Sequence, residues 1–586
     1  MLDPRIYRAA FLPVIAALAA LMFSLEEAPQ PLEGPISTPV FKGRESARLA
    51  RSIATLAPVR TPGSVGDTAV ADQVKETFGS VTGGEVSEQS FDVDGQPAEN
   101  VILTLPGLRP ETLLVLAARD SEAGAGATTS AAATATLLTL ADTLGSSRHE
   151  RTIVLASVSA TADGTEGVRQ LIDQLPVERG IEAAIVIQQP GVEDRLPPFA
   201  FPGRAGTAMV PPRLIGTAAE IATVQFGEPA YPIDGWQAFS RLALPVGIGP
   251  SAALADEGVD AISISGSGER PPDPDSSLPE DISSETMFMV GSSALGLLLT
   301  LDEAKTGIEG GPAHYITIGD NLLPGWPLSV LALALILPAL LAAGDVWLRD
   351  RRRNPRATRR SIPWVLERGL LPLAALLVAY LFGLVGLIPR PDFPYDPGRF
   401  GAGGDGPVAL AVILLAIALA ALLIRPLRTP LDAEPQTLAA AAGLTCSVAV
   451  LGIWLLNPFM ALLLVPAAHV WLLPARAQGP PRSTTIAIFA LISLIPILLA
   501  GAEVAGSLDL GISALWQLLL LIASGQISIL IALLWCLLIG GLLAAVVAAR
   551  ARLSPELIGA RGRTRGPSGY AGPGSLGGTP SSLPRA

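Results

Sequence analysis

Residues 150–167 read ERTIVLASVSATADGTEG and hold the end of one apolar run and the start of a helical pattern. The run from Thr152 to Val158 is short, apolar and rich in β-branched residues, which predicts a buried strand. Thr165 begins a helical pattern that continues to Leu175. A strand joined to a helix by a short turn is the repeating unit of α/β proteins, so this stretch indicates the fold class.

The same alternation of strand and helix patterns continues on both sides of this stretch. Strands are predicted over 100–105, 113–117, 183–188, 244–248 and 260–265, and helices over 131–144 and 283–301. This alternation predicts an α/β domain with a largely parallel sheet. The ligand crevice of such a sheet forms at the carboxyl ends of its strands, so we expect the residues after Ala117, Val158, Ile187 and Ile248 to converge.

The whole chain is too apolar for a single soluble domain. Of its 586 residues, 50% are hydrophobic and 16% are charged, and the apolar residues gather in runs long enough to cross a bilayer. The predicted membrane spans are 6–25, 326–348, 365–388, 407–424, 437–455, 459–474, 484–502 and 526–548. Residues 512–524 are predicted to form an interfacial or re-entrant helix, because two full crossings there would export the Arg-rich C-terminal tail.

Charge is distributed unevenly along the chain. Residues 24–320 hold 40 acidic and 18 basic side chains, whereas Arg5, Arg8 and seven arginines between 349 and 360 flank the first two predicted spans. Short loops rich in Arg stay in the cytoplasm. We therefore expect a multi-pass protein of the cell membrane with a large extracytoplasmic domain and both termini in the cytoplasm. The acidic domain would repel phosphate, which argues against nucleic-acid binding.

These patterns divide the chain into six predicted parts. They are an N-terminal transmembrane anchor (1–25), a linker (26–44), an extracytoplasmic domain (45–305), a juxtamembrane linker (306–325), a membrane domain of about seven helices (326–549) and a disordered cytoplasmic tail rich in Arg, Gly and Pro (550–586). A cleaved signal peptide is the alternative for the first run, but no clear small-x-small cleavage site follows it, so we favour the anchor.

Cysteine usage excludes two kinds of extracytoplasmic site. Cys446 and Cys536 are the only cysteines, and both lie in predicted spans. The predicted extracytoplasmic domain therefore has neither a disulfide framework nor a thiolate zinc site. The strong preference for Arg over Lys indicates a GC-rich genome, and with the low cysteine content it indicates a bacterial source.

Four segments of the predicted extracytoplasmic domain follow the order of a known enzyme family. LLVLAARDS (113–121) stands where a strand of that family ends in His-x-Asp-Ser, and GAGATTSAAATATLLTLADTL (124–144) resembles its Gly-x-Asn-Asp-Asn-Ala-Ser-Gly turn and the following helix. ERTIVLASVSATADGTEG resembles the strand ending in Gly-Ala-Glu-Glu-x-Gly, and DISSETMFMVGSSALGLLLTLD (281–302) resembles the terminal helix. Over roughly residues 45–303 the chain thus resembles the clan-MH, family-28 zinc exopeptidases. The resemblance implies a three-layer zinc-exopeptidase-like domain, which accompanies the α-helical membrane domain.

The resemblance also shows which residue types stand at the family's metal and catalytic positions. These positions fall on Ala118 and Ser251 for the two His ligands, Thr129 and Gln188 for Asp ligands, and Thr161 and Ala162 for the paired Glu residues, one of which is the general base. Asp120, two residues after the first His position, keeps the residue type of the family.

These replacements remove the chemistry of the family. A co-catalytic pair of zinc ions needs imidazole nitrogens and carboxylate oxygens, which Ala, Thr, Ser and Gln do not supply. Neither Thr161 nor Ala162 can take a proton from water near neutral pH. We therefore expect no catalytic residue, no metal ligand and no cofactor. We expect Asp120 to pair with Arg119 or to cap a turn, and a direct role in binding is the alternative. The crevice around it is expected to be polar and neutral, and it could hold a peptide or a small polar ligand, with collapse or simple hydration as the alternatives.

The three histidines of the chain are not expected to replace the lost ligands. His149 precedes a strand and lies at the end of the sheet opposite the crevice, and His314 lies next to the membrane. His469 lies within a predicted span, where a helix-packing hydrogen bond is the common explanation and a polar intramembrane site the alternative.

Three hypotheses about function follow. The leading hypothesis is a catalytically inactive, peptidase-like membrane protein whose extracytoplasmic domain binds a polypeptide or a membrane partner. The second is an active membrane-bound zinc aminopeptidase or exopeptidase with displaced ligands, which would need zinc. The third is a transporter or lipid-handling protein whose outward domain gates access. The order of the domains resembles that of membrane-bound family-28 metallopeptidases and of the peptidase-like subunit of GPI transamidase.

Overall fold

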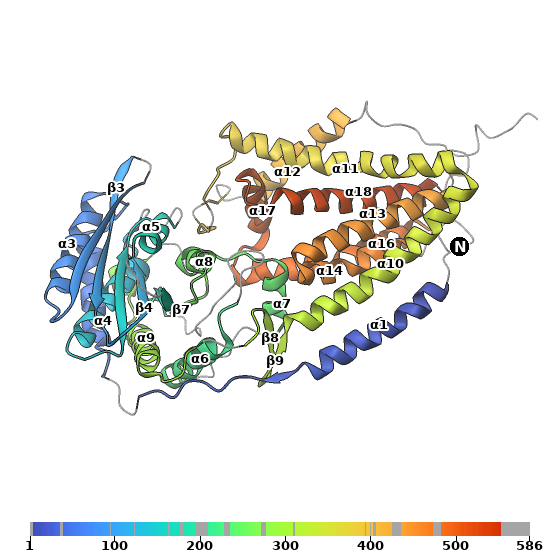
Figure 1. Cartoon of the computed structure of the whole chain (residues 1–586). Coiled ribbons are helices and arrows are strands. Elements are labelled where there is room, and N and C mark those ends of the chain that lie inside the picture. The colour runs from blue at the N-terminus through green and yellow to red at the C-terminus, as the bar shows by residue number, and fades with distance from the viewer. Residues whose placement is uncertain are drawn as a thin grey trace, which may run out of the picture.

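The computed structural model combines an α/β part and a bundle of long helices, which lie side by side (Figure 1). It describes residues 4–35, 39–93, 95–121, 124–161, 165–175, 180–193, 209–227, 235–270, 277–308, 311–392, 394–398, 400–401, 406–424, 435–472 and 482–551. The predicted disordered tail lies almost entirely outside these residues. The predicted boundaries between the six parts of the chain stay predictions.

A six-stranded mixed sheet forms the centre of the α/β part. Its strands are β2 (Glu85–Val93), β3 (Gln96–Leu105), β4 (Arg109–Ala118), β5 (Arg151–Val158), β6 (Ile181–Gln188) and β7 (Ala261–Ser265), in the order β2-β3-β5-β4-β6-β7. Strands β5, β4, β6 and β7 pair in parallel, whereas β3 pairs antiparallel with both β2 and β5. The parallel strands are apolar runs buried on both faces, as such strands are when helices cover the whole sheet.

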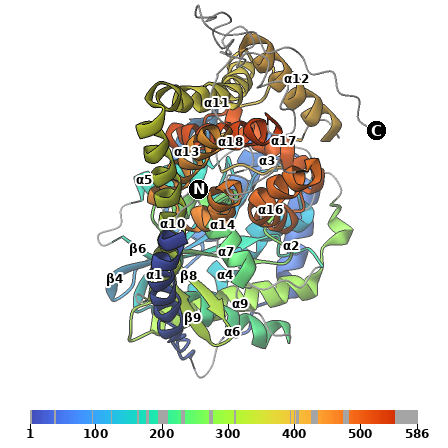
Figure 2. The ribbon, with the colours of Figure 1, turned by 90° about the vertical axis from the view of Figure 1, so that its right-hand side faces the viewer.

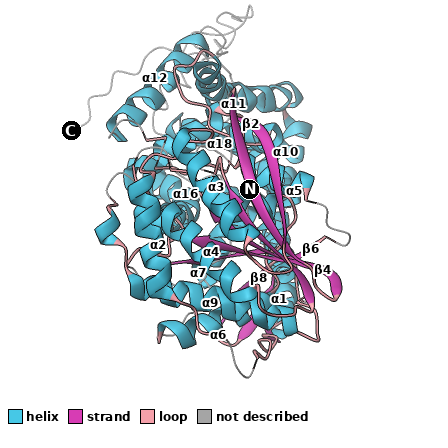
Figure 3. Ribbon diagram, turned by 90° about the vertical axis from the view of Figure 1, so that its left-hand side faces the viewer, coloured by secondary structure: helices cyan, strands magenta, loops and turns pink. Residues whose placement is uncertain are grey.

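Helices cover both faces of the sheet and make three layers. Leu113 and Val115 of β4 point into one core, which contains residues of α2 (Gly43–Leu56), α3 (Val65–Gly79), α4 (Ala132–Leu144), α6 (Pro212–Phe226) and α9 (Ser284–Glu303). Leu114 and Leu116 point into a second core with α5 (Glu166–Gln174) and α8 (Gly249–Asp256). This alternation follows from the two-residue period of a strand. Figure 3 shows the strands, in magenta, among these helices.

The expected strand over 244–248 is wrong, because this segment is the loop between α7 (Gly235–Ala243) and α8. Pro245 has no N–H to donate to a ladder, and the carbonyl of Val246 accepts a hydrogen bond from the guanidinium of Arg241. The apolar side chains of this loop pack against Val504 and Leu508 at the end of α16 (Ser483–Ser507) instead of entering the sheet. The segment therefore connects the α/β part to the helical bundle.

A second, smaller sheet lies in the two segments predicted as linkers. Strands β1 (Glu26–Glu27), β9 (Asn321–Pro324) and β8 (Tyr315–Ile318) pair in that order. β1 follows α1 (Pro4–Phe23), and β9 leads directly into α10 (Gly325–Arg353). The small sheet thus holds the end of the first apolar helix beside the beginning of the second.

By length and composition, six of the described helices could cross a membrane. They are α9, α10, α11 (Pro355–Leu384), α13 (Pro435–Leu456), α16 and α18 (Ile529–Ala551), while α1, α12 (Gly406–Ile424), α14 (Pro458–His469) and α17 (Ala514–Ala523) contribute shorter apolar stretches. Because α9 lies in the core of the α/β part, five of the six candidates belong to the bundle. Seen from the end that holds the N-terminus, α12 lies at the edge of the bundle (Figure 2).

Two of the shorter helices lie in segments with specific predictions. The 12 residues of α14 extend about 18 Å, and the 10 residues of α17 about 15 Å, at roughly 1.5 Å per residue. Both lengths fall short of the roughly 30 Å hydrocarbon core. The short α17 agrees with an interfacial or re-entrant helix. The helix α14 and the 3-10 turn at Val470–Leu472 account for all described residues of the span predicted over 459–474, of which 473 and 474 lie outside the described residues.

The bundle has one end near the α/β part and one end remote from it. At the near end, the side-chain amide of Asn457, between α13 and α14, donates to the carbonyls of Leu242 and Ala243 at 2.9 and 3.2 Å. At the remote end, Thr437 Oγ1 donates to Asp350 Oδ2 at 3.0 Å. The arginines between 349 and 360 therefore lie at the remote end, as does the N-terminal end of α1 (Figure 1). Which side of the membrane each end faces stays a prediction.

A close approach of two glycines fixes the crossing of α11 and α18. A Cβ on Gly540 would lie 2.5 Å from Cα of Gly369, and small residues allow this approach between apolar helices. We expect Gly540→Ala to lower the thermal unfolding temperature of the purified full chain, because overpacking of this kind costs about 1–3 kcal/mol.

The matched control for this crossing is Gly344→Ala on α10, where the added methyl group meets nothing within 4 Å. The control should leave stability unchanged or raise it, since Ala is favoured over Gly in a helix. Equal unfolding temperatures for the two variants would contradict the close approach of α11 and α18 at these glycines.

Candidate functional site

The positions predicted from the resemblance lie at the carboxyl edge of the parallel strands. Ala118 ends β4, Thr161 follows β5, Gln188 ends β6, Thr129 lies in a π-helical turn (Ala127–Ala131) that precedes α4, and Ser251 lies in the first turn of α8. We call these five residues and Asp120 the edge cluster. Ala162, the remaining predicted position, lies outside the described residues.

Specific contacts bring the elements of the edge cluster together. The backbone N–H of Gly191, after β6, donates to the carbonyl of Thr128 at 3.0 Å, which joins β6 to the π-helical turn. Thr134 Oγ1 on α4 donates to the carbonyl of Ala118 at 3.3 Å. The side chain of Gln188 lies against the start of α8, where its Nε2 is 3.4 Å from the position of a Cβ on Gly249.

Asp120 is bound by the loop after β5. Its Oδ2 accepts the backbone N–H of Thr161 at 3.0 Å, and its Oδ1 accepts the Thr161 hydroxyl at 2.6 Å. The expected pairing of Asp120 with Arg119 is wrong, because Arg119 extends from the opposite face of β4 and forms its ion pair with Asp67. The alternative expectation, that Asp120 caps a turn, matches its bond to the Thr161 N–H. The retained carboxylate therefore holds the ends of β4 and β5 together.

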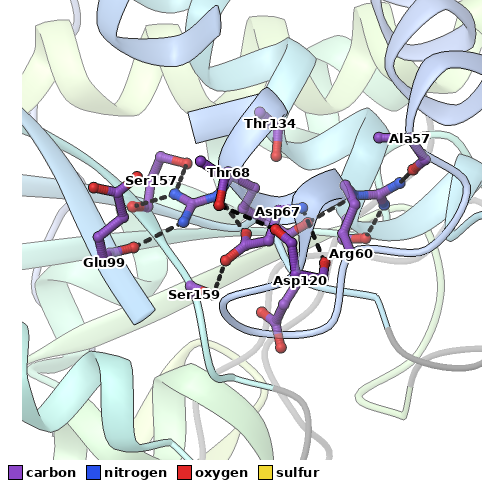
Figure 4. Close-up of polar contacts among 12 residues, drawn as sticks. Ala57, Arg60, Asp67, Thr68, Glu99, Asp120, Thr134, Ser157 and Ser159 are labelled. Atoms are coloured by element: carbon purple, nitrogen blue, oxygen red, sulfur yellow. Dashed lines mark hydrogen bonds and ion pairs between the residues drawn. The ribbon is translucent and has the colours of Figure 1, made fainter. Parts of the chain in front are cut away.

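A buried ion pair lies beside the edge cluster (Figure 4). Arg119 Nε donates to Asp67 Oδ1 at 2.8 Å, and the Arg119 guanidinium also donates to the carbonyl of Glu99 at 2.7 Å and to Ser157 at 3.3 Å. Oδ2 of Asp67 accepts the hydroxyl of Ser159 at 2.9 Å. The pair thus joins α3 to three neighbouring strands.

Arg60 places a second buried cation in the same region. Its guanidinium donates to the carbonyls of Ala57, Arg119 and Ala125 at 2.6–3.0 Å and to the Ser130 hydroxyl at 2.8 Å. Burial lowers the pKa of Arg60 to about 10, and the charges of Asp120 and Asp67 oppose this shift. Arg60 is therefore charged at neutral pH, so two buried arginines balance two buried aspartates.

Sequence reasoning missed Arg60 and Asp67 as parts of this region. One local signal was available, because Ser64 and Asp67 follow the Ser-x-x-Asp pattern of a capped helix start. Ser64 Oγ does accept the N–H of Asp67, at 3.2 Å. The partner of the Asp67 side chain is 52 residues away in the chain, and no local pattern marks such a pairing.

Backbone strain also collects at the carboxyl edge. Three described residues other than glycine have a positive φ, and two of them, Ala160 (54°) and Gln189 (50°), follow the ends of β5 and β6. Such conformations cost about 1–3 kcal/mol and cluster at functional sites. Gln189 is buried, and its side-chain oxygen accepts a hydrogen bond from Ser267. The described residues that directly follow β5 and β6 are therefore held in a defined conformation.

The described side chains at this edge do not fit a zinc ion. Across the residues that the structure describes, no group of three or more His, Cys, Asp or Glu side chains could hold a metal ion. Ala118 has no donor atom, and the carboxylates of Asp67 and Asp120 are engaged by Arg119, Ser159 and Thr161. Zinc ligands in proteins are imidazole nitrogens, thiolates and carboxylates, so this donor set is unsuitable.

Histidine side chains have other partners. His149 lies beyond the start of β5, at the end opposite the edge cluster as expected, and its ring nitrogens face Asp302 Oδ2 and the carbonyl of Leu144, both at 3.2 Å. His469 Nε2 lies 2.7 Å from the carbonyl of Leu335 on α10. This contact confirms the expected hydrogen bond between packed helices.

No model of a known protein family and no curated protein sequence matches the chain. Among solved structures, the chain is similar to Fimbriiglobus ruber glutaminyl cyclase, with 14% identity and a TM-score of 0.37 over 46% of this chain and 99% of that one. A leucine aminopeptidase precursor from Bacteroides thetaiotaomicron has 15% identity and a TM-score of 0.37 over 45% of this chain and 99% of that one. A Zn-dependent exopeptidase from Parabacteroides distasonis has 16% identity and a TM-score of 0.35 over 44% of this chain and 98% of that one. Similarity at these scores carries no argument about the activity of this chain.

Proposed function

We propose that this chain is a membrane-embedded binding protein whose α/β domain has a peptidase-like architecture without peptidase chemistry. One observation carries this proposal: protein donors hold both buried carboxylates beside the edge cluster. Asp67 is paired with Arg119, and both oxygens of Asp120 accept hydrogen bonds from Thr161. These contacts favour structural roles for the two carboxylates over the metal-ligand and general-base roles that the zinc exopeptidase mechanism needs.

The remaining side chains of the edge cluster suit binding better than catalysis. Thr129, Thr161, Gln188 and Ser251 are neutral hydrogen-bonding groups near pH 7, and a serine nucleophile would need an adjacent base. The described histidines lie elsewhere, at the opposite end of the sheet or in and beside the bundle. Neutral hydroxyl and amide groups match the backbone of an extended polypeptide, which presents neutral donors and acceptors of its own. The proposed ligand is therefore a polypeptide segment, either free or part of a membrane partner.

The proposal places the α/β domain outside the cytoplasm. The Arg-rich ends of the helices lie remote from this domain, and Arg-rich ends stay in the cytoplasm. Both termini are then cytoplasmic, and the acidic domain faces the cell exterior or a periplasm. A polypeptide ligand would reach the edge cluster from that side.

Site-specific photocrosslinking in the full chain, within its cell membrane, tests the binding role. A photoreactive amino acid that replaces Thr129 should capture a discrete polypeptide. The same amino acid in place of Asp72, on the exposed face of α3, should not capture it. Adding Ser251→Trp should abolish capture at Thr129, because the indole would fill the space in front of the edge cluster. Equal capture at both positions, or capture insensitive to Ser251→Trp, would contradict the proposal.

A further inference from the structure

A pocket of about 390 Å³ lies between the α/β part and the helical bundle, away from the edge cluster. Four segments form its walls: the end of α7 and the following loop, the two flanks of the β8–β9 hairpin, the first turn of α10, and the turn between α13 and α14. These segments come from distant parts of the chain. The pocket is therefore a feature of how the two parts of the protein meet.

Close packing fixes the walls of this pocket. A Cβ on Gly325 would lie 2.7 Å from Cζ of Phe459 and 3.0 Å from Cβ of His314, so a larger residue would force these neighbours to shift. The rings of His314 and Phe459 pack with centroids 5.8 Å apart. Asn457 Oδ1 accepts the N–H of Met460 at 2.9 Å, while its amide nitrogen donates to two carbonyls at the end of α7. The polar atoms of Asn457 thus hold the wall in place.

The chemistry of the lining selects an uncharged ligand. Among the residues that the structure describes, the lining contains no Asp, Glu, Lys or Arg, and most of its side chains are apolar or aromatic. Its volume falls within the range of small-molecule sites, which is about 300–1,000 Å³. One helical turn with its side chains occupies roughly 500 Å³, from a diameter of about 10–12 Å and a pitch of about 5.4 Å, so a helix does not fit.

The position of the pocket indicates where such a ligand comes from. Trp326, in the first turn of α10, lines the pocket and is 56% exposed. Tryptophan at the end of an apolar helix is typical of the membrane–water interface. The apolar helices of the bundle, on the side of the pocket away from the α/β part, expose large aliphatic side chains, for example Leu498 on α16. The exposed Trp326 therefore indicates that one wall of the pocket lies at the level of the membrane surface.

We propose that this pocket binds one acyl chain of a membrane lipid. The chain would enter beside Trp326 and lie against Phe459 and Leu242, while its headgroup stays in the interfacial layer. A lipid in this position would contact α7, the hairpin, α10 and the turn between α13 and α14 at once. It would thus help to hold the α/β domain against the bilayer, independently of any polypeptide at the edge cluster.

Photolabelling tests the lipid site in the full chain, reconstituted in nanodiscs that contain phosphatidylcholine with a diazirine in one acyl chain. Mass spectrometry should find the label concentrated in residues 312–329 and 456–459 compared with the lipid-facing surface of α16. Ser329→Trp, which fills the pocket, should remove most of this labelling. Leu498→Trp, on the exposed face of α16, should leave it unchanged.

A second filling variant, Ala313→Trp, changes an exposed position of the lining and so keeps the experiment decisive if Ser329→Trp does not fold. Loss of labelling in either folded variant supports the lipid site. Labelling of the pocket that does not exceed that of α16, or that both folded filling variants leave unchanged, would overturn it.

Discussion

Asp67→Asn lowers the free energy of unfolding of the α/β domain by about 3–5 kcal/mol, because it leaves the Arg119 guanidinium buried without a counter-charge. The side chains of Arg119 and Asp67 are 0% and 2% exposed, so water cannot replace the lost carboxylate. At roughly 2–4 °C per kcal/mol for a domain of this size, the thermal unfolding temperature falls by about 6–20 °C. Thermal unfolding of the full chain in detergent, followed by far-UV circular dichroism and tryptophan fluorescence, measures the change.

The control for this pair is Asp142→Asn in an exposed pair of the same type. Lys42 Nζ lies 3.0 Å from Asp142 Oδ2, and the two side chains are 54% and 65% exposed. Exposed ion pairs contribute little to stability because solvent screens them, so the unfolding temperature should barely move. The double variant Asp67→Asn/Arg119→Met should be more stable than Asp67→Asn alone, because it removes the unpaired charge. An unfolding temperature for Asp67→Asn equal to that of the control would show that the pair is not buried as described.

Arg241→Met should have the second large effect, and this effect should appear where the two parts of the protein meet. Arg241 and Glu269 form an ion pair whose side chains are 1% and 4% exposed, and Arg241 also donates to Ser507 Oγ at 2.8 Å. Loss of Arg241 leaves the buried carboxylate of Glu269 without its counter-charge, which lowers the free energy of unfolding by about 3–5 kcal/mol. It also removes the hydrogen bond between α7 and the end of α16.

Hydrogen exchange measures this second effect locally. In Arg241→Met, the backbone amides of residues 504–510 should exchange faster, while those of β4 and β5 change less. Arg213→Met is the matched control, because the Arg213 guanidinium donates an exposed hydrogen bond to the carbonyl of Gly307 at 3.4 Å. Unchanged exchange over 504–510 in a folded Arg241→Met protein would refute a role for this ion pair in joining the α/β domain to the bundle.

The central strands could be predicted from the sequence because burial on both faces leaves a clear apolar run. The strands predicted over 100–105, 113–117, 152–158, 183–188 and 260–265 are confirmed, with somewhat different ends. β2 was missed because it is an edge strand in which only Gln89 is buried, so its sequence shows no apolar period. The 244–248 segment has strand-like residues, but its apolar side chains serve the contact with α16.

Chain direction is enough to locate the predicted site residues in the fold, whereas the pairing of side chains from distant segments could not be predicted. The carboxyl ends of parallel strands meet at one edge, so the placement of Ala118, Thr161 and Gln188 there followed from strand order alone. The pairing of Arg119 with Asp67 depends on the face of the sheet toward which the Arg119 side chain points and on the place where α3 packs. Neither is encoded in the spacing of neighbouring residues.

Zinc content is the most direct test of the proposal that the edge cluster has lost its catalytic chemistry. The full chain, purified in detergent, is loaded with zinc at neutral pH, dialysed and analysed by elemental mass spectrometry, beside aminopeptidase and carboxypeptidase substrates. An active zinc aminopeptidase treated in the same way serves as the positive control. The expected result is a folded protein without stoichiometric zinc and without turnover. About two tightly bound zinc ions per chain, with turnover, as in two-metal hydrolases, would contradict the proposal.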